Sequence, residues 1–167
     1  MRNSRQELKH VRIARKGDLA SIVELHLKTM GYISSLVPPD FGQPMRTLPP
    51  TEKVASEFET VLLDEESIML VCEVDGRLAG FVLGAIETQG DDLLEAPFLT
   101  VVYLEIHPAF RRQNVGRSLL LDLEKWAREN NLITLELTVC DANSPAIELY
   151  ESMNYERLEL RMAKRLA

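Results

Sequence analysis

A two-residue turn, Asp75-Gly76, separates two long apolar runs and limits the folds open to this chain more than any other feature. The runs are SIMLVCEV (67–74) and RLAGFVLGAI (77–86). Asp-Gly between two such runs is typical of a tight β-hairpin, because both turn positions require a positive φ. A third strand-like run, FLTVVYLEIHP (98–108), follows. These residues predict an antiparallel group of strands at the centre of the fold.

The remaining segments add helices and strands around this hairpin. Apolar residues at a period of two predict further strands over HVRIAR (10–15), TLELTV (134–139) and YERLELRMA (155–163). Helical spacing predicts helices after Gly17, over about 52–63, after residue 117 to about Asn130, and over 144–153. The order is β-α-α-β-β-β-α-β-α-β, which requires at least one parallel strand pair across a helix. We therefore predict an α/β (α+β) fold with a mixed, mostly antiparallel sheet flanked by helices.

Polar residues mark the predicted helix starts. Asp18, Thr51 and Ser144 are expected N-caps, because their side-chain oxygens can accept hydrogen bonds from the first free amides of a helix. Pro145 suits the first helical position. Between the first two helices lies GYISSLVPPDFGQPMRTLPP (31–50), which we interpret as a long connection or a short helix broken by loops.

Length and composition limit the class of protein. The 167 residues, 46% hydrophobic and 27% charged, fit one domain over 1–167, in which 1–8 is expected to be a flexible tail. A net charge of −7 argues against a broad nucleic-acid-binding face. We expect no membrane partner and a cytoplasmic location, because no apolar run could span a bilayer and the N-terminus has no signal-peptide core. Cys72 and Cys140 are expected to be reduced, and no cysteine–histidine spacing suggests a metal site.

The heptapeptide RRQNVGR (111–117) joins the third central strand to a helix. A helix N-terminus offers unpaired amides and the positive end of the helix dipole, which suits an anion such as phosphate. Three arginines at this end oppose the dipole, and a bound anion would explain them. The residues alone leave two interpretations open, an anion-binding loop and a solvated basic turn. The segment is not a Walker loop and lacks the Gly-x-Gly-x-x-Gly of a dinucleotide fold.

Two motifs resemble those of a known family. Arg111-x-x-Asn114-x-Gly116, after Ile106-His107-Pro108, resembles the acetyl-CoA-binding motif of the GNAT superfamily of N-acetyltransferases. NSPAIELYESMNY (143–155) resembles a second motif of that family, at the spacing the family uses. The matching positions of the second motif are Asn143, Ala146, Leu149, Tyr150 and Tyr155. The predicted order of elements is also that of the family, so the resemblance covers nearly the whole chain.

The chain departs from the family pattern at two positions, where Asn114 and Asn154 replace glycine. Glycine is favoured at such points because it reaches positive φ without a Cβ clash. Asparagine is among the few other residues that visit the left-handed region routinely. We therefore predict left-handed backbone at both positions, with Asn154 as the cap after a helix that ends at Met153.

The resemblance implies acetyl-CoA as cosubstrate, with no metal. It implies that backbone amides within 112–117 bind the pyrophosphate and that the end of the preceding strand pairs with the pantetheine arm. One strand N–H of that stretch would polarise the acetyl carbonyl. The implied cofactor-binding residues are Leu104, Glu105, Ile106, Arg111, Arg112, Gln113, Asn114, Val115, Gly116, Arg117, Asn143 and Tyr150.

The resemblance also suggests catalytic residues. Tyr150 matches the family's tyrosine that protonates the leaving thiolate, and an ordinary tyrosine pKa near 10 suits that role. The alternative for Tyr150 is an aromatic residue of the core. Glu105 is the candidate base that deprotonates the acceptor amine, with Glu87 as a weaker candidate; Glu105 could instead face solvent or make a structural hydrogen bond. An acyl intermediate on Cys140 is not favoured, because no histidine is placed to activate the thiol.

The predicted reaction is therefore direct transfer of acetyl to a primary amine. The acceptor could be a protein N-terminus, a lysine, a polyamine or a small metabolite, and the alternative function is a CoA-binding sensor without turnover. The acidic loop 87–97, with Glu87, Asp91, Asp92 and Glu95, leans towards a cationic acceptor or is simply a solvated loop. We expect this loop and 31–50 to shape the acceptor pocket. A homodimer is consistent with the family.

Overall fold

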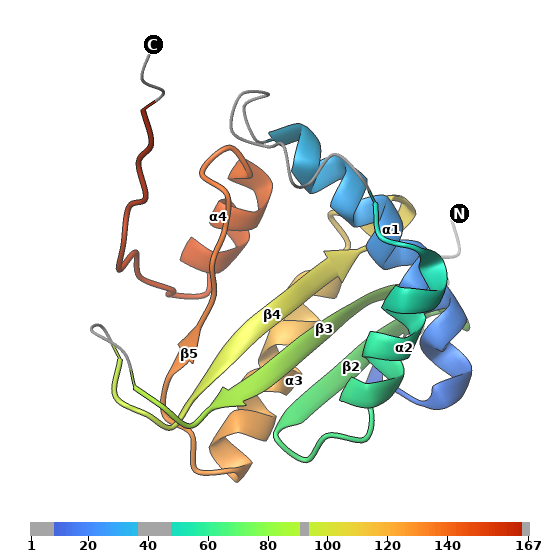
Figure 1. Cartoon of the computed structure of the whole chain (residues 1–167), viewed down its shortest axis with the longest axis horizontal. Helices are drawn as coiled ribbons and strands as arrows, with labels where there is room; N and C mark the ends of the chain where they lie inside the picture. Colours follow the sequence, from blue (N-terminus) through green and yellow to red (C-terminus); the bar gives the residue numbers. More distant parts are fainter. Residues whose placement is uncertain (1–8, 37–47, 91–93, 165–167) are drawn as a thin grey trace, which may run out of the picture.

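A computed structural model describes residues 9–36, 48–90 and 94–164 of the chain. One five-stranded sheet runs through it in the order β1-β2-β3-β4-β5 (Figure 1). The strands are β1 (Lys9–Ile13), β2 (Ser67–Val74), β3 (Arg77–Glu87), β4 (Phe98–Ile106) and β5 (Leu135–Glu136). The first four pair antiparallel, and β5 pairs parallel with β4. The predicted fold class, a mixed and mostly antiparallel sheet flanked by helices, is confirmed.

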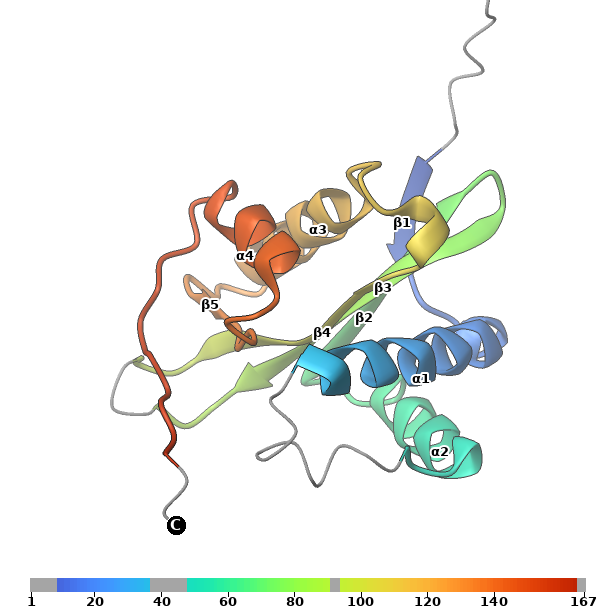
Figure 2. The same cartoon turned by 90° about the horizontal axis from the view of Figure 1, so that it is seen from above.

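Helices cover both faces of the sheet (Figure 2). The α-helices are α1 (Leu19–Leu36), α2 (Thr51–Val61), α3 (Val115–Glu129) and α4 (Ser144–Glu151), and short 3-10 turns occupy η1 (Lys16–Asp18) and η3 (Pro108–Phe110). Figure 2 shows α1 and α2 on one face and α3 and α4 on the other. The strand order in the sheet follows the chain order. The helices α1 and α2 come from the N-terminal half of the chain, and α3 and α4 come from the C-terminal half.

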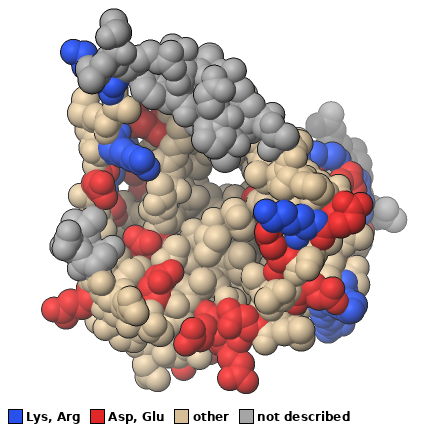
Figure 3. Space-filling model, in the orientation of Figure 1, with Lys and Arg blue, Asp and Glu red and all other residues tan. Residues whose placement is uncertain are grey.

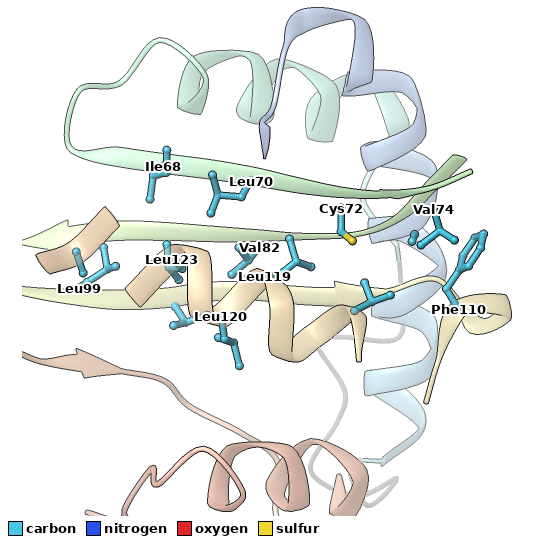
Figure 4. Close-up of a cluster of buried hydrophobic side chains, with 14 of the residues drawn as sticks. Ile68, Leu70, Cys72, Val74, Val82, Leu99, Phe110, Leu119, Leu120 and Leu123 are labelled. Carbon is cyan, nitrogen blue, oxygen red and sulfur yellow. The ribbon is translucent and has the colours of Figure 1, made fainter. Parts of the chain in front are cut away.

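The core lies in two layers, one on each side of the sheet. Between the sheet and α3, the fully buried side chains of Leu119, Leu120 and Leu123 meet residues of the strands (Figure 4). The buried residues of α3 fall at positions 115, 116, 119, 120, 123 and 127, which is the spacing of one helix face. The other layer joins Ile22 of α1 and Phe58 of α2 to the opposite face of the strands. These two layers hold β4 rigidly from both sides.

The central hairpin forms as predicted. Asp75 and Gly76 have φ values of 49° and 75°, so both turn residues are left-handed, as in a type I′ turn. β3 then pairs with β4 from Gly80↔Ile106 to Glu87↔Phe98.

Several predicted boundaries are wrong. The helix over 19–30 continues to Leu36, so 31–36 is the end of α1 rather than a connection, and 37–47 lies outside the described residues. Asp18 does not cap α1: its carboxylate accepts from the guanidinium of Arg12 and from the amide of Arg15, which places it inside the preceding turn. Thr51 and Ser144 are the first helical residues, after Pro50 and Asn143 as N-caps, so Pro145 is the second helical residue of α4.

The C-terminal part of the chain also differs from the prediction. β5 comprises two residues instead of the predicted 134–139, so Cys140 lies in irregular chain. The run 155–164 forms no strand, although it alternates apolar and charged residues. Its Leu160 and Met162 are exposed by 71% and 83%. Figure 1 shows the run beside α4. The predicted flexible tail, 1–8, lies outside the described residues.

Candidate active site

The C-terminal half of β4 has an open edge. The parallel pairing with β5 is limited to Leu99↔Leu135 and Thr100↔Glu136, so β4 from Val101 onwards has no strand partner on that side among the described residues. The surface is hollowed between α4 and α1 in the view of Figure 3. A strand edge without a partner presents free N–H and C=O groups, which an extended ligand can pair with.

The backbone groups at this edge belong to Leu104 and Ile106. The amide of His107 donates to the carbonyl of Ala79 on β3 (2.9 Å), so alternate residues before it, including Glu105, also direct their backbone groups towards β3. The residues in between direct theirs to the open edge. Of the three residues predicted to pair with a pantetheine arm, Leu104 and Ile106 therefore present backbone groups there, and Glu105 does not.

A β-bulge decides where the side chain of Glu105 lies. Leu83 pairs with Tyr103 and Gly84 with Val101, so Val102 is the extra residue. Before the bulge, Val101 packs into the α3 layer; after it, Leu104 does so, and Tyr103 packs into the α1–α2 layer. The inserted residue therefore reverses the alternation and directs Glu105 to the α1 side, away from Leu104 and Ile106.

Glu105 is buried and paired with a histidine. Its Oε1 lies 2.7 Å from Nδ1 of His26 on α1, and the two side chains are only 5% and 6% exposed. The other carboxylate oxygen, Oε2, is buried and has no hydrogen-bond partner among the described residues. The imidazole stands edge-on to the rings of Phe58 and Tyr103, with centroids 5.0 and 4.6 Å away. Burial next to Glu105 raises the pKa of the Tyr103 phenol.

The sequence analysis gave no role to His26, which lies within the helix predicted after Gly17. The pair spans 79 positions, and no local pattern connects them. The available signal was that each residue is a titratable side chain among apolar ones, His26 on a helix and Glu105 in a strand.

The turn after β4 has the predicted left-handed asparagine. Asn114 has φ 60° and ψ 19° and is the N-cap of α3. Asn154, the other predicted position, has φ 65°, although α4 ends at Glu151 rather than Met153. Arg112 also has a positive φ, of 63°, which the sequence did not indicate. In α3 the amide of Ser118 donates to the carbonyl of Asn114 (3.0 Å). The amides before Ser118 lie in the first turn of the helix, where backbone N–H groups have no intrahelical partner.

The arginines of this turn have protein partners. Arg117 donates to the carbonyl and hydroxyl oxygens of Ser152 at the end of α4 (3.2 and 2.7 Å). The guanidinium of Arg111 lies over the ring of Tyr32 on α1, 5.2 Å from its centroid. Arg112 is 86% exposed and only 3.9 Å from Glu148, a loose ion pair. Contacts within the protein therefore account for Arg111 and Arg117 without a bound anion. Of the three arginines, Arg112 has the weakest contact with a protein partner. Gln113 donates to the carbonyl of Ala109 and fastens the turn.

Gly116 and Val115 are buried at the start of α3. A Cβ on Gly116 would lie 2.9 Å from Cδ2 of Leu149 on α4 and 3.7 Å from Ile106. The backbone of Gly116 is not left-handed, so its small size serves the packing of α3 against α4. This differs from the turn role that the motif suggested.

α4 carries Asn143 and Tyr150. The backbone of Asn143 caps the helix by accepting from Ala146 and Ile147, and its side chain makes no capping bond. Tyr150 packs against the α3 layer of the core together with Leu104 and Ile106. Burial raises the pKa of the Tyr150 phenol to about 12, because the ionised form loses hydration. The phenol is therefore a weaker acid than its ordinary pKa near 10 implies.

The other candidates lie elsewhere. Glu87 is exposed at the far end of β3, six residues from Phe81, the partner of Glu105, which is roughly 20 Å along a strand. His107 accepts from the amide of Ala109 and caps η3. Cys140 is half-buried, and both it and buried Cys72 are free thiols, as predicted. The acidic loop includes 91–93, which lie outside the described residues.

The sequence profile described as "Acetyltransferase (GNAT) family" matches residues 28–155 of the chain. The chain belongs to the GNAT acetyltransferase family. It is an acyl-CoA N-acyltransferase by that membership. A curated relative, Acetyltransferase ECA0875 of Pectobacterium atrosepticum, is 28% identical over 111 residues, which cover 66% of this chain and 73% of the relative.

Solved structures of GNAT acetyltransferases share the fold. A variant of the BH1408 protein from Bacillus halodurans superposes with a TM-score of 0.82 at 19% identity, covering 95% of this chain and 99% of that one. The aminoglycoside N-acetyltransferase AAC(6')-Iy, in complex with the bisubstrate analog CoA-S-monomethyl-acetylneamine, has a TM-score of 0.74 at 16% identity, covering 96% and 99%. No helix within the described residues of this GNAT chain is long and apolar enough to cross a membrane.

Proposed function

We propose that this GNAT protein transfers the acetyl group of acetyl-CoA directly to a primary amine, with Glu105 as the base and Tyr150 as the acid. One observation carries the proposal: Glu105 points to the α1 side of β4 in the stretch where its edge is open, and Tyr150 packs into the core layer on the other side of the sheet. An amine and a thioester meeting at that edge would have a carboxylate on one side and a phenol on the other. Holding both reactants together replaces a covalent enzyme intermediate.

The residues present fit acetyl-CoA. Leu104 and Ile106 offer backbone groups for an extended pantetheine arm, and one of their amides is the proposed donor to the acetyl carbonyl oxygen. The amides around Asn114 form a helix start suited to the pyrophosphate, with exposed Arg112 beside it. The Asn143 side chain, which makes no capping bond, is the proposed further contact. Acetyl-CoA supplies the activated acyl group; the chain supplies binding, orientation and proton transfer.

The proposed proton transfers balance. Glu105 accepts a proton from the acceptor amine, which frees the nitrogen lone pair to form the new N–C bond. The C–S bond breaks, and its electron pair leaves with the sulfur. Tyr150 donates its hydrogen bond to that sulfur, and the second proton, which the nitrogen loses as the amide forms, goes to the thiolate, so that CoA leaves as the neutral thiol. Because the pKa of the Tyr150 phenol is near 12, well above the value of about 8.5 for an ordinary thiol, Tyr150 stabilises the departing charge chiefly as a hydrogen-bond donor.

The proposed acceptor is a cationic small-molecule or peptide amine. The net charge of −7 supports this class, because an acidic protein attracts cationic substrates. The neighbour AAC(6')-Iy carries a bisubstrate analog that joins CoA to an aminoglycoside-type amine. Protein N-termini, lysine, polyamines and small amino metabolites remain the members of the class to be compared.

The test is a panel of these amines with detection of the free thiol of released CoA. We expect turnover with at least one cationic amine. Acetyl-CoA at a hundredfold excess over its Kd should also stabilise the protein by about 2.7 kcal/mol, seen as a raised melting temperature. Stabilisation without turnover on any amine would replace the enzyme with a CoA-binding sensor. A melting temperature unmoved by acetyl-CoA would refute both functions.

A further inference from the structure

We infer that His26 is a positioning residue for Glu105: its Nδ1–H holds one carboxylate oxygen and leaves Oε2 as the oxygen that accepts the proton of the amine. This inference rests on the proposed function, because it concerns the same base. Neither the sequence motifs nor the comparisons with other proteins assign a role to His26.

The Nδ1 of His26 lies 2.7 Å from Oε1 of Glu105, which is hydrogen-bond distance. An ionised carboxylate can only accept, so in the proposed arrangement the proton of this hydrogen bond is on Nδ1. A carboxylate buried to 5% exposure without a donor would be driven towards its neutral form, which cannot act as a base. His26 supplies the missing donor, and it does so from a different element, α1, so the contact also fixes α1 against β4.

The aromatic rings around His26 restrict its orientation. Phe58 and Tyr103 stand edge-on to the imidazole on two sides, and both are packed into the α1–α2 layer. Rotation of the ring would require those side chains to move. The Nδ1–H is therefore held at one place. A fixed donor fixes the orientation of the Glu105 carboxylate, so that the same oxygen is always the one left to accept a proton.

The charged surroundings leave His26 without a substitute. On β4, Tyr103 is neutral, since its pKa is raised; on α2, Glu57 contributes a further negative charge nearby. On β3, the partner of Glu105 is the apolar Phe81. Within residues 9–36, 48–90 and 94–164, no lysine or arginine makes an ion pair with Glu105. Loss of His26 therefore removes the donor and leaves only neutral or negative neighbours.

The proton balance assigns different tasks to the two oxygens. Oε1 stays hydrogen-bonded to Nδ1–H throughout, and the proton lost by the amine goes to Oε2, directly or through one water. Oε2 is the buried oxygen that lacks a protein partner, so it is the one with capacity to accept. His26 neither gains nor loses a proton in this step.

The test compares His26→Leu, which removes the donor, with His26→Asn, whose amide nitrogen can donate from nearly the position of Nδ1. The measurement is the pH profile of kcat/KM with the amine found in the panel. We expect the acid limb of His26→Leu to move up by at least about 1 pH unit, because the unpaired carboxylate is harder to ionise. His26→Asn should return the limb close to its wild-type position. An unmoved acid limb in His26→Leu, with only the melting temperature lowered, would assign His26 to packing.

Glu105→Gln separates this inference from the proposed function. If Glu105 is the base, the variant should lose about 10²–10⁴-fold in kcat/KM and lose the acid limb. If Glu105→Gln keeps its rate, the base assignment fails whatever His26 does. If Glu105→Gln loses its rate while His26→Leu keeps the wild-type profile, only the role of His26 fails.

A spectroscopic measurement covers the case in which His26→Leu does not fold. The imidazole of His26 in the wild-type protein is observed by ¹⁵N and ¹H NMR, with the assignment made from His26→Asn. We expect a protonated Nδ1 whose proton resonance is shifted far downfield, and an upfield return of that resonance in Glu105→Gln. An unprotonated Nδ1 in the wild type would overturn the inference.

Discussion

Gly116 of α3 lies so close to Leu149 of α4 that a Cβ on the glycine would be 2.9 Å from the leucine Cδ2. The contact sets how near the two helices approach, and Tyr150 is the residue next to Leu149. A second link holds the same pair of helices, the hydrogen bonds from Arg117 to Ser152. The turn after β4 and the helix that carries the proposed acid are therefore positioned by one another.

Gly116→Val should destabilise the protein by about 1–3 kcal/mol, because a branched side chain overpacks the contact between α3 and α4. It should also lower turnover more than acetyl-CoA binding alone explains, since α4 would shift with Tyr150. The measurements are the free energy of unfolding in urea, kcat and the Kd of acetyl-CoA.

The matched control is Gly31→Val in α1, where a Cβ would meet nothing within 4 Å. Valine and glycine differ by only a few tenths of a kcal/mol in helix propensity, so stability should hardly change. Equal losses at 116 and 31 would mean that the contact with Leu149 has no special cost.

Asp18 should give the protein a pH-dependent part of its stability. The hydrogen bond from Arg12 holds the pKa of the Asp18 carboxyl below its ordinary value. A carboxyl whose folded pKa is lowered stabilises the fold above the unfolded pKa, about 3.9, and loses that contribution as pH falls through the folded value. Asp18→Asn should therefore be less stable than the wild type by about 1–2 kcal/mol at neutral pH. The difference should narrow as pH falls below the unfolded pKa and close below the lowered folded pKa.

The measurement is urea unfolding of both proteins between neutral pH and about pH 2.5. Asparagine keeps an acceptor for the amide of Arg15, so the difference measures the charge of Asp18 together with its second acceptor oxygen, which faces Arg12. A stability gap that stays constant across the whole range would show that the charge contributes nothing.

The parts of the fold that the sequence predicted are those fixed by neighbours along the chain. The Asp75-Gly76 turn depends on two residues and the runs on either side, and it forms as expected. The N-cap at Asp18 failed because a strand residue, Arg12, takes its carboxylate. The strand at 155–163 failed because alternation indicates only which side chains would share a face, whereas a strand also needs a pairing partner, and the run pairs with no strand of the described chain.

The same division applies to the candidate site. The left-handed backbone of Asn114 could be predicted, because a motif position and the properties of asparagine sufficed. The placement of Glu105 could not, since it depends on a bulge at Val102 that the sequence does not mark. The contact with His26 depends in turn on that bulge and on the packing of α1. Partners for Arg111 and Arg117 were equally invisible, because Tyr32 and Ser152 lie far away in the chain.

Asn114 should behave as a substitute for glycine. Its φ of 60° is strained for a β-branched residue, so Asn114→Val should cost on the order of 1–3 kcal/mol and weaken acetyl-CoA binding. Asn114→Gly should bind acetyl-CoA nearly as the wild type does. Calorimetric titration of both variants with acetyl-CoA measures the effect.

Asn131 provides the control, because it has the same φ of 60° just beyond the far end of α3. Asn131→Val should lower stability to a similar degree and leave the Kd of acetyl-CoA unchanged. If valine at 114 binds acetyl-CoA as tightly as the wild type while glycine loses affinity, the side-chain amide is itself a ligand and the substitution is not a glycine mimic.

Tyr150→Phe should lower kcat while acetyl-CoA affinity stays close to the wild-type value. Tyr150 packs against the α3 layer of the core, and the loss of its hydroxyl removes the proposed donor to the departing sulfur. Because burial raises its pKa to about 12, we expect a loss of about 10²-fold in kcat, at the low end of the range for a general acid.

Tyr155→Phe is the matched control: its ring lies 5.6 Å from that of Tyr150, and its buried hydroxyl has no hydrogen-bond partner among the described residues. Removing that hydroxyl should leave kcat unchanged and stability unchanged or slightly higher, since an unsatisfied buried group is lost. Stopped-flow and steady-state rates with the best acceptor measure both variants, and an unchanged kcat in Tyr150→Phe would make Tyr150 a packing residue of the α3 layer.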